Sequence, residues 1–315
     1  MTLNSLIRNL SVAIIISMSV KNKHLFVVIF LLLLSACSTQ TDAEDISPSG
    51  SSEYINNTGS DTMVNLALAW AERYHLNAPQ TNLAVTGGGS GTGIASLINK
   101  TTDIANASRR IKQEELDNAE SNGISPTEFT VARDAIAVIV NPNNPVEELT
   151  LQQLSDIYSG KINNWREVGG EDRPIVRLSR ETNSGTHVHF LEQVLRLGEK
   201  ENNTLFSKNT LLLPSSEVIG GEIRENPNAI GYDGLGYVTE DMKVIAVSDS
   251  RSANAKFIFP SADTVNNGTY PIARDLYMYT AGEPFGSVKH YIEWIFSEEA
   301  QEIVADLGFV PIFSP

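Results

Sequence analysis

The sequence predicts an α/β fold, in which helices pack against a largely parallel sheet. Two observations lead to this fold class. Segments with apolar residues at helical spacing alternate with short apolar runs that suit strands. A glycine-rich loop, residues 87–93, also joins one expected strand to the helix that follows it.

The expected helices follow from the spacing of apolar side chains. In the first, residues 62–74, Met63, Leu66, Ala67 and Trp70 recur at the 3.6-residue period, which predicts one buried face. Further helices are expected at residues 94–99, 113–121, 151–158, 185–197, 217–225, 288–296 and 298–307.

The expected strands are short apolar segments bounded by turn residues. The continuous run AIAVIV, residues 135–140, suits a strand that is buried on both faces, and Pro142 and Pro145 follow it. Further strands are expected at residues 83–85, 103–107, 175–178, 243–247 and 276–279.

Composition and charge exclude several classes of protein. With 41% hydrophobic residues in 315, the chain can bury a core, so bulk disorder is excluded. A net charge of −15 argues against nucleic-acid binding, which requires a basic surface. One cysteine permits neither an intrachain disulfide nor a zinc site of several thiolates. We expect no cofactor and no metal.

The N-terminal segment reads as an export signal. Residues 25–34, LFVVIFLLLL, follow Lys21 and Lys23 and precede the sequence Leu-Ser-Ala-Cys37. A basic stretch, a short apolar core and small residues form a secretory signal peptide, and this core is too short for an ordinary membrane span. Residues 1–36 are therefore the expected signal peptide, although Met18 would also open a complete signal.

The sequence Leu-Ser-Ala-Cys resembles the lipobox of bacterial lipoproteins. The resemblance implies cleavage before Cys37 and a lipid thioether on that cysteine, which anchors the chain to a membrane. A buried cysteine in a signal-anchor helix is the alternative. Residues 37–53 are then the lipidated cysteine and a flexible polar tether. Cleavage removes three basic residues and no acidic one, so the charge of the mature chain becomes −18.

Three loop-to-helix junctions combine glycine, hydroxyl side chains and a helix N-terminus. Helix N-termini carry unpaired N–H groups and a partial positive charge, so they favour anions, and glycine lets a ligand approach the backbone. Ordinary helix caps explain each junction equally well when it is taken alone. The junctions are residues 59–62, 87–93 and 180–186, and the last begins with Arg180.

Several named motifs are excluded on their residues. The glycine-rich loop lacks the Gly-Lys-Ser/Thr of a phosphate-binding loop and has neither dinucleotide nor hydrolase-elbow spacing. His187 and His189 lie two positions apart, so a helix does not direct them to one metal ion.

Seven stretches, taken in order, resemble one family: the phosphate-binding, substrate-capturing subunits of bacterial ABC phosphate transporters. They are GSDTM at 59–63, GGGSGTGI at 87–94, DIANASR at 103–109, DIYSGKINNW at 156–165, RETNSGT at 180–186, NPNAIGY at 226–232 and GFVPI at 308–312. The resemblance implies a monomer of two α/β lobes, each with a mixed sheet flanked by helices, which two hinge strands join as in type II periplasmic binding proteins. It also implies inorganic phosphate in the cleft and a membrane permease as partner. The first lobe would comprise residues 54–136 and 238–315, and the second residues 137–237.

The resemblance also implies the residues that contact phosphate. Carried over position by position, they are Ser60, Asp61, Ser90, Arg180, Ser184, Gly185 and Thr186, and Thr62 and Thr92 are their neighbours.

One position departs from the family's pattern. Some members have an aspartate after the serine equivalent to Ser108, where it accepts a hydrogen bond from the phosphate proton, and this chain has Arg109. We expect Asp61 to take over that task, unless it only caps the first helix. Arg109 is then either a second cation for the ligand or the partner of a surface acid.

Two other readings remain open at this stage. The chain could bind another tetrahedral oxyanion or serve as a sensor or adhesin. It could also be a secreted phosphatase with Ser90 or Ser184 as nucleophile, which would need a base. The available histidines are His75, His187, His189 and His290.

Overall fold

The computed structural model describes residues 53–249 and 256–313, all within one compact unit, Ser52–Pro315. The expected signal peptide, Cys37 and the tether before Glu53 lie outside the described residues. Glu53, the last residue of the expected tether, begins the first strand. Within the described part of the chain, no helix is both long and apolar enough to cross a bilayer.

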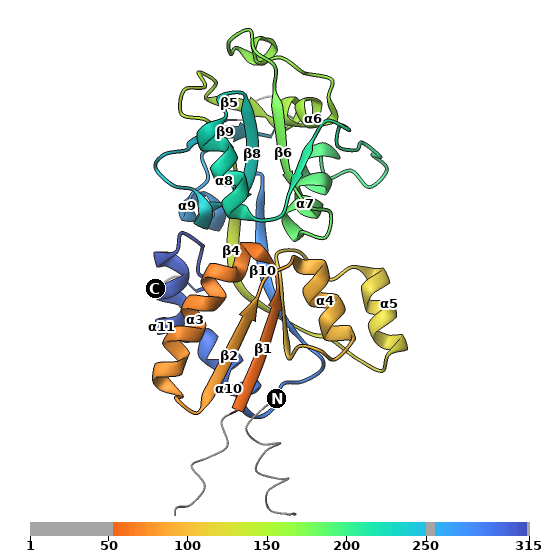
Figure 1. Cartoon of the computed structure of the whole chain (residues 1–315), viewed down its shortest axis with the longest axis vertical. Coiled ribbons are helices and arrows are strands. Elements are labelled where there is room, and N and C mark those ends of the chain that lie inside the picture. Colours follow the sequence, from red (N-terminus) through yellow and green to blue (C-terminus); the bar gives the residue numbers. More distant parts are fainter. Residues whose placement is uncertain (1–52, 250–255, 314–315) are drawn as a thin grey trace, which may run out of the picture. The chain divides into compact units, whose positions relative to one another are not determined.

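The first lobe is a five-stranded sheet region covered by helices (Figure 1). Its strand order is β2-β1-β3-β10-β4, with β1 parallel to β2 and β3 and with β10 antiparallel to both of its neighbours. Its elements are β1 (Glu53–Gly59), β2 (Thr81–Thr86), β3 (Ile104–Ala107), β10 (Ala273–Thr280), η1 (Asp61–Met63), α3 (Val64–Asn77), α4 (Ser90–Ile98), α5 (Gln113–Ser121), α10 (Gly286–Ile295) and α11 (Glu298–Asp306).

The predicted apolar face of the first helix is confirmed. Met63, Leu66, Ala67 and Trp70 are fully buried. Met63, Leu66 and Trp70 lie in the core of the first lobe, where α3 packs against α10 and α11. The Trp70 indole donates to the carbonyl of Ala300 over 2.8 Å, which fixes α3 against α11.

The second lobe continues the same sheet with β8, β6 and β7 on one path and with β9 and β5 beside it. Its core gathers aromatic residues, among them Tyr158, Trp165, Phe190 and Tyr232. Its elements are β5 (Glu148–Thr150), β6 (Val176–Arg180), β7 (Leu211–Leu213), β8 (Ala229–Gly234), β9 (Lys243–Ser248), α6 (Leu151–Ser159), α7 (Gly185–Phe190), α8 (Ser216–Glu225), α9 (Ala262–Asn266), η2 (Trp165–Val168), the π-helical η3 (Leu191–Leu195) and η4 (Leu235–Tyr237).

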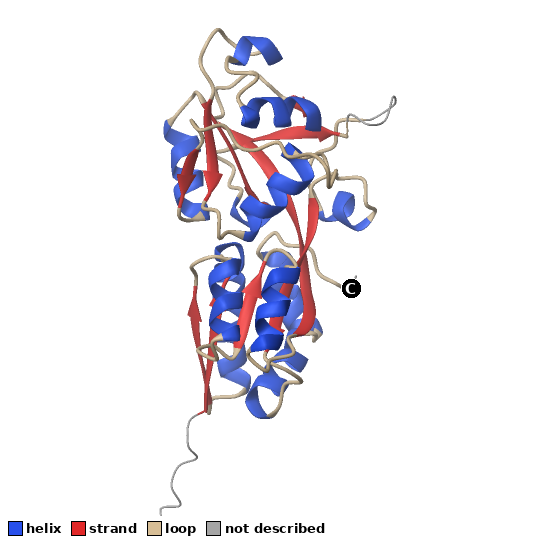
Figure 2. Cartoon of the chain, turned by 90° about the vertical axis from the view of Figure 1, so that its right-hand side faces the viewer, coloured by secondary structure: helices blue, strands red, loops and turns tan. Residues whose placement is uncertain are grey.

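Strand β4 (Thr127–Val140) belongs to both lobes (Figures 1 and 2). Its first half pairs with β10, and its second half, from Ile136 on, pairs with β8 and β9. The expected apolar run 135–140 forms this second half and is buried throughout, as predicted. The link between the lobes is thus part of the sheet itself.

The structure differs from the pattern-based expectations at several points. The alternation of helices and strands predicted a largely parallel sheet, whereas the family resemblance implied mixed sheets; the sheet is mixed, because β4 and β10 run against their neighbours. The expected helix 185–197 changes to π-helical hydrogen bonding at Leu191. Strand β9, expected in the first lobe, pairs with β5 and with the second half of β4, so strand pairing does not follow a lobe boundary at residue 237.

Candidate functional site

The three junctions predicted from the sequence meet where the two lobes face each other. The first two follow β1 and β2 of the first lobe, and the third follows β6 of the second. Strands β1 and β2 are parallel, so their carboxyl ends lie at one edge of the sheet, where ligands of α/β folds bind. The junctions are joined by the hydrogen bonds described next.

A cluster of buried serine hydroxyls connects the first two junctions. Ser60 Oγ donates to Ser108 Oγ over 3.0 Å, and the Ser108 N–H donates to Ser90 Oγ over 3.0 Å. Gly185 of the third junction lies against this pair, because a Cβ at Gly185 would stand 2.5 Å from both Ser90 Oγ and Ser108 Oγ. Only glycine permits this approach of the lobes. Ser108 was named from the sequence only as the neighbour of Arg109 and was not predicted to belong to the site.

Two threonines meet across the lobes. Thr62 Oγ1 and Thr186 Oγ1 are 2.9 Å apart and buried. Ser184 caps α7, since its Oγ accepts from the Thr186 N–H over 3.2 Å. The predicted residues Ser60, Thr62, Ser90, Ser184, Gly185 and Thr186 are therefore brought together.

Arg180 places a buried positive charge at the third junction, where it pairs with Asp61 of the first junction. It is the last residue of β6, and its side chain is 1% exposed. Nη1 donates to Ser216 Oγ over 3.1 Å, and Nη2 donates to the Pro214 carbonyl and to Asp61. Nε has no partner among the described residues. A buried guanidinium with an unused N–H is suited to an oxyanion.

Asp61 is bound from both lobes. Its Oδ2 accepts from Arg180 Nη2 over 2.7 Å, and its Oδ1 accepts from the Gly88 N–H over 3.0 Å. Asp61 is the first residue of η1 and follows the N-cap position, which Ser60 occupies, and its carboxylate oxygens bond Gly88 and Arg180 instead of the first helical turn. The alternative that Asp61 is only a helix cap is therefore wrong.

Arg109 lies outside the hydroxyl cluster. Its Nη1 and Nη2 donate to the two carboxylate oxygens of Glu115 over 2.8 and 2.7 Å. Glu115 Oε2 also accepts from the Lys112 N–H at the start of α5. The structure favours the expectation that this arginine pairs with an acid, because its donors stabilise the beginning of a helix.

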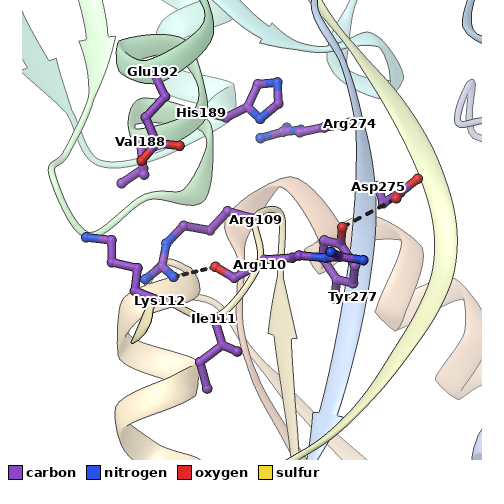
Figure 3. A pocket seen from close by; sticks show the side chains of 10 residues that line it. All are labelled: Arg109, Arg110, Ile111, Lys112, Val188, His189, Glu192, Arg274, Asp275 and Tyr277. Atoms are coloured by element: carbon purple, nitrogen blue, oxygen red, sulfur yellow. Dashed lines mark hydrogen bonds between the residues drawn. The ribbon is translucent and has the colours of Figure 1, made fainter. Parts of the chain in front are cut away.

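A cavity of about 470 Å³ borders the cluster (Figure 3). Four cationic side chains are among its lining residues, those of Arg109, Arg110, Lys112 and Arg274. Lys112 lies 3.7 Å from Glu114, and Arg110 contacts Glu128 over 3.3 Å and the Tyr277 ring. The cations are thus neutralised pairwise, so we assign no separate anion site to this cavity. The remaining lining residues are Ile111, Val188, His189, Glu192 and Asp275.

The histidines do not act as bases for the two candidate serines in this structure. Ser90 Oγ accepts from Ser108, and Ser184 Oγ accepts from Thr186. His187 instead contacts Ser179 Oγ over 3.0 Å. Burial, with the nearby charge of Arg274, lowers the pKa of His189 to about 3. Within the described ranges, no three His, Cys, Asp or Glu side chains are grouped to hold a metal ion.

Arg274 was not among the residues predicted from the sequence, and it contacts the cluster from β10. Nη1 donates to Thr186 Oγ1 over 3.0 Å and to the Ser108 carbonyl over 3.2 Å. Its partner is Asp134 of β4, directly opposite in the strand register. One signal in the sequence could have identified the pair. Asp134 and Arg274 each lie at the start of an apolar strand segment, and charged side chains in such positions are buried only when they pair.

Asp233 is a further buried carboxyl behind Arg180. Its Oδ1 accepts from Ser216 Oγ over 2.9 Å and from the Gly234 N–H over 2.8 Å, whereas Oδ2 has no partner among the described residues. Burial raises the pKa of Asp233 from 3.8 to about 6, although Arg180 acts in the opposite direction. The folded state therefore resists ionisation of this group more than the unfolded chain does.

This shift predicts a pH-dependent effect of Asp233→Asn. A raised folded-state pKa contributes stability that is present below about pH 3.8 and is lost as the pH rises through about 6. Asparagine keeps the Oδ1 acceptor and carries no charge to bury. We expect the variant's Tm, relative to wild type, to be higher at pH 7 than at pH 4. Calorimetry at both pH values measures this, with exposed Asp117→Asn as control, and an equal difference at both would contradict it.

Comparison with known proteins identifies the family. The model of the PBP superfamily domain matches residues 46–299. The phosphate-binding protein PstS of Pseudomonas aeruginosa is 31% identical over 84% of each chain, and that of Bacillus subtilis is 30% identical over 93% of this chain and 95% of its own. The chain belongs to the PstS family. The residues that meet at the lobe interface are thus those of a PstS-type protein.

A solved structure agrees with this family membership. It is a putative phosphate ABC transporter substrate-binding protein with bound phosphate from Clostridium perfringens. It is 32% identical, with a TM-score of 0.72, and the match covers 83% of the present chain and all of the other. The expected two-lobed α/β architecture of this PstS-type protein is confirmed.

Proposed function

We propose that this chain captures inorganic phosphate outside the cytoplasm and delivers it to the permease of an ABC phosphate transporter. The observation that carries the proposal is Arg180, a buried guanidinium that pairs with Asp61 of the other lobe and has an Nε–H without a partner among the described residues. Membership of the PstS family supports the same ligand. Phosphate offers several acceptor oxygens, which match a site of donors.

The donors come from residues already held in place. Ser60 and Ser90 supply hydroxyls from the first lobe, and Arg180, Ser184 and Thr186 supply groups from the second. We propose that the anion lies among them and bonds the Arg180 fork. The protein's net charge of −15 opposes an anion at long range, so attraction depends on these local donors.

Asp61 gives the site a means of recognising the phosphate proton. An ionised carboxylate only accepts hydrogen bonds, and phosphate near neutral pH still carries a proton to donate, whereas sulfate carries none. Asp61 is bonded to Arg180, so we propose that it lies beside the bound anion. Against sulfate it would present a lone pair to a lone pair, which disfavours that ligand.

Binding would hold the lobes together. Besides the Asp61–Arg180 pair, Asn183 of the second lobe bonds the glycine-rich loop. Its Nδ2 donates to the Gly88 carbonyl over 2.8 Å, and its carbonyl accepts from the Gly91 N–H over 3.0 Å. Phosphate that bridges the lobes and these direct contacts would favour the same closed arrangement, and release would require both sets to break.

Asn183→Ala is expected to weaken phosphate binding without removing any proposed ligand contact. The variant loses the side-chain bonds to Gly88 and Thr92, so we expect the dissociation constant to rise about threefold to tenfold, as for one or two hydrogen bonds. The change should lie in the dissociation rate, which stopped-flow measurement resolves. Asn122→Ala, at the C-cap position that follows α5, is the control. An unchanged dissociation rate would remove Asn183 from the closing contacts.

Calorimetric titration of the mature chain tests the proposal. We expect binding of phosphate and much weaker binding of sulfate at neutral pH. Equal affinity for the two anions, or no heat with phosphate, would overturn it. We propose that no catalysis accompanies binding, and a chromogenic phosphoester provides the check. Turnover that Ser90→Ala abolishes would favour the hydrolase reading.

We further propose that the chain is exported, anchored through a lipid on Cys37 and monomeric. Family membership supports export, and the lipobox-like sequence supports the anchor. Membrane fractionation tests the anchor: the wild-type chain should sediment with membranes, and Cys37→Ala should not. Sedimentation that is equal for both chains would contradict it.

A further inference from the structure

Arg274 contacts residues of both lobes at once. It lies on β10 of the first lobe, and its side chain is 2% exposed. Nη1 donates to Thr186 Oγ1 of the second lobe over 3.0 Å, and Nη2 is 3.4 Å from Thr62 Oγ1 of the first. Figure 3 shows the guanidinium beside the His189 ring. His189 is neutral near pH 7 because burial lowers its pKa to about 3, so it adds no charge here.

The charge of Arg274 is compensated from behind. Asp134 Oδ2 accepts from Arg274 Nε over 3.0 Å and from Nη2 over 2.7 Å, and Asp134 Oδ1 accepts from the Leu235 N–H. Burial raises the pKa of Asp134, and Arg274 acts against that rise. Arg274 therefore acts on the site less as a free charge than as a rigid set of donors.

That set of donors constrains the two threonine hydroxyls. Each hydroxyl has one proton and two lone pairs, whereas arginine only donates. Arg274 occupies a lone pair on each threonine, and the bond between the threonines uses one more lone pair and one proton. One proton is left over, whichever threonine donates to the other. The pair therefore keeps one O–H that can only be given to a further acceptor.

We propose that Arg274 is a positioning residue of the anion site, which directs the spare O–H of the Thr62–Thr186 pair toward an oxygen of the bound oxyanion. This inference rests on the proposed function. It assigns Arg274 a role through the threonines and not through direct contact with phosphate. Because Thr186 comes from the second lobe, the arrangement forms only when the lobes are together.

A double-mutant cycle tests this role. The neutral pair Arg274→Gln with Asp134→Asn removes the guanidinium without leaving a buried carboxylate unpaired. The effect of this neutral pair on phosphate affinity is measured by calorimetric titration in two backgrounds, which are the native chain and the double variant Thr62→Val, Thr186→Val. We expect the neutral pair to raise the dissociation constant about tenfold or more in the native background, and less than about threefold without the hydroxyls.

A second buried arginine provides the matched control. Arg177 donates from Nε to the Ile157 carbonyl and from Nη2 to the Ile162 carbonyl, within the second lobe. Arg177→Gln should lower Tm and leave phosphate affinity unchanged. If the neutral pair does not fold, Arg274→Lys replaces it in both backgrounds. Lysine keeps the charge but lacks the planar fork. The loss of phosphate affinity caused by Arg274→Lys should therefore also be smaller in the background without the two hydroxyls.

The outcomes separate this inference from the proposed function. Absence of phosphate binding by the wild-type chain would overturn the proposed function. If the wild type binds and the loss caused at Arg274 is equal in both backgrounds, Arg274 does not act through the threonines and the inference is wrong. An unchanged affinity with only a lower Tm would also overturn it.

Discussion

Arg180→Ala is expected to raise the dissociation constant for phosphate by about 100-fold or more, because truncating one partner of a buried charge pair costs about 2–5 kcal/mol. The variant removes the unused Nε–H and leaves Asp61 without its cation. Every oxyanion should be affected, since the guanidinium does not distinguish phosphate from sulfate. Calorimetric titration at fixed salt concentration gives the affinity, and circular dichroism gives Tm.

A surface arginine separates this effect from a general loss of charge. Arg73 pairs with Glu299 on the outside of the first lobe, and both side chains are well exposed. Arg73→Ala should leave the phosphate affinity unchanged. If Arg180→Ala binds phosphate within twofold of wild type, Arg180 is not part of the site.

Asp61→Asn is expected to reduce discrimination between phosphate and sulfate more strongly than Arg180→Ala or Asn183→Ala does. The amide can donate, so it accommodates the lone pairs of sulfate, and it no longer accepts the phosphate proton as an anion. Asparagine can still accept from Arg180 Nη2 through its amide oxygen, and we expect phosphate itself to bind more weakly. The ratio of the two affinities is therefore the informative quantity, and we expect it to fall about tenfold or more.

The measurement is a pair of titrations, with phosphate and with sulfate, on Asp61→Asn and on the control Asp117→Asn. Asp117 lies on the exposed side of α5, and its carboxylate accepts from Gln113 Nε2 over 2.7 Å. The control should keep the wild-type ratio. An unchanged ratio in Asp61→Asn would mean that this carboxylate serves only to hold Arg180 across the lobes.

Local signals predicted the three junctions, whereas long-range pairing decided what surrounds them. Glycine, hydroxyls and helix starts are adjacent in the chain, so Ser60, Ser90 and Ser184 could be found by inspection. Arg274 and Asp134 are 140 residues apart, and only the register of β10 on β4 brings them together. A single sequence gives no signal for that register.

The role of Arg109 and the assignment of β9 show the same limit. The spacing of Arg109 and Glu115 is compatible with an ion pair, but the alternative of a second site cation could be decided only by the direction of the side chain. The segment 243–247 was predicted as a strand, and β9 (Lys243–Ser248) confirms it. Its lobe depended on pairing with β4, which lies about a hundred residues earlier in the sequence.

The sharing of β4 has a thermodynamic consequence. Its first half completes the sheet of one lobe, and its second half forms part of the core of the other. Unfolding of either lobe therefore disturbs a strand that its neighbour shares. The two halves of the molecule are therefore coupled in unfolding, and a substitution that weakens the core of one lobe lowers the stability of both.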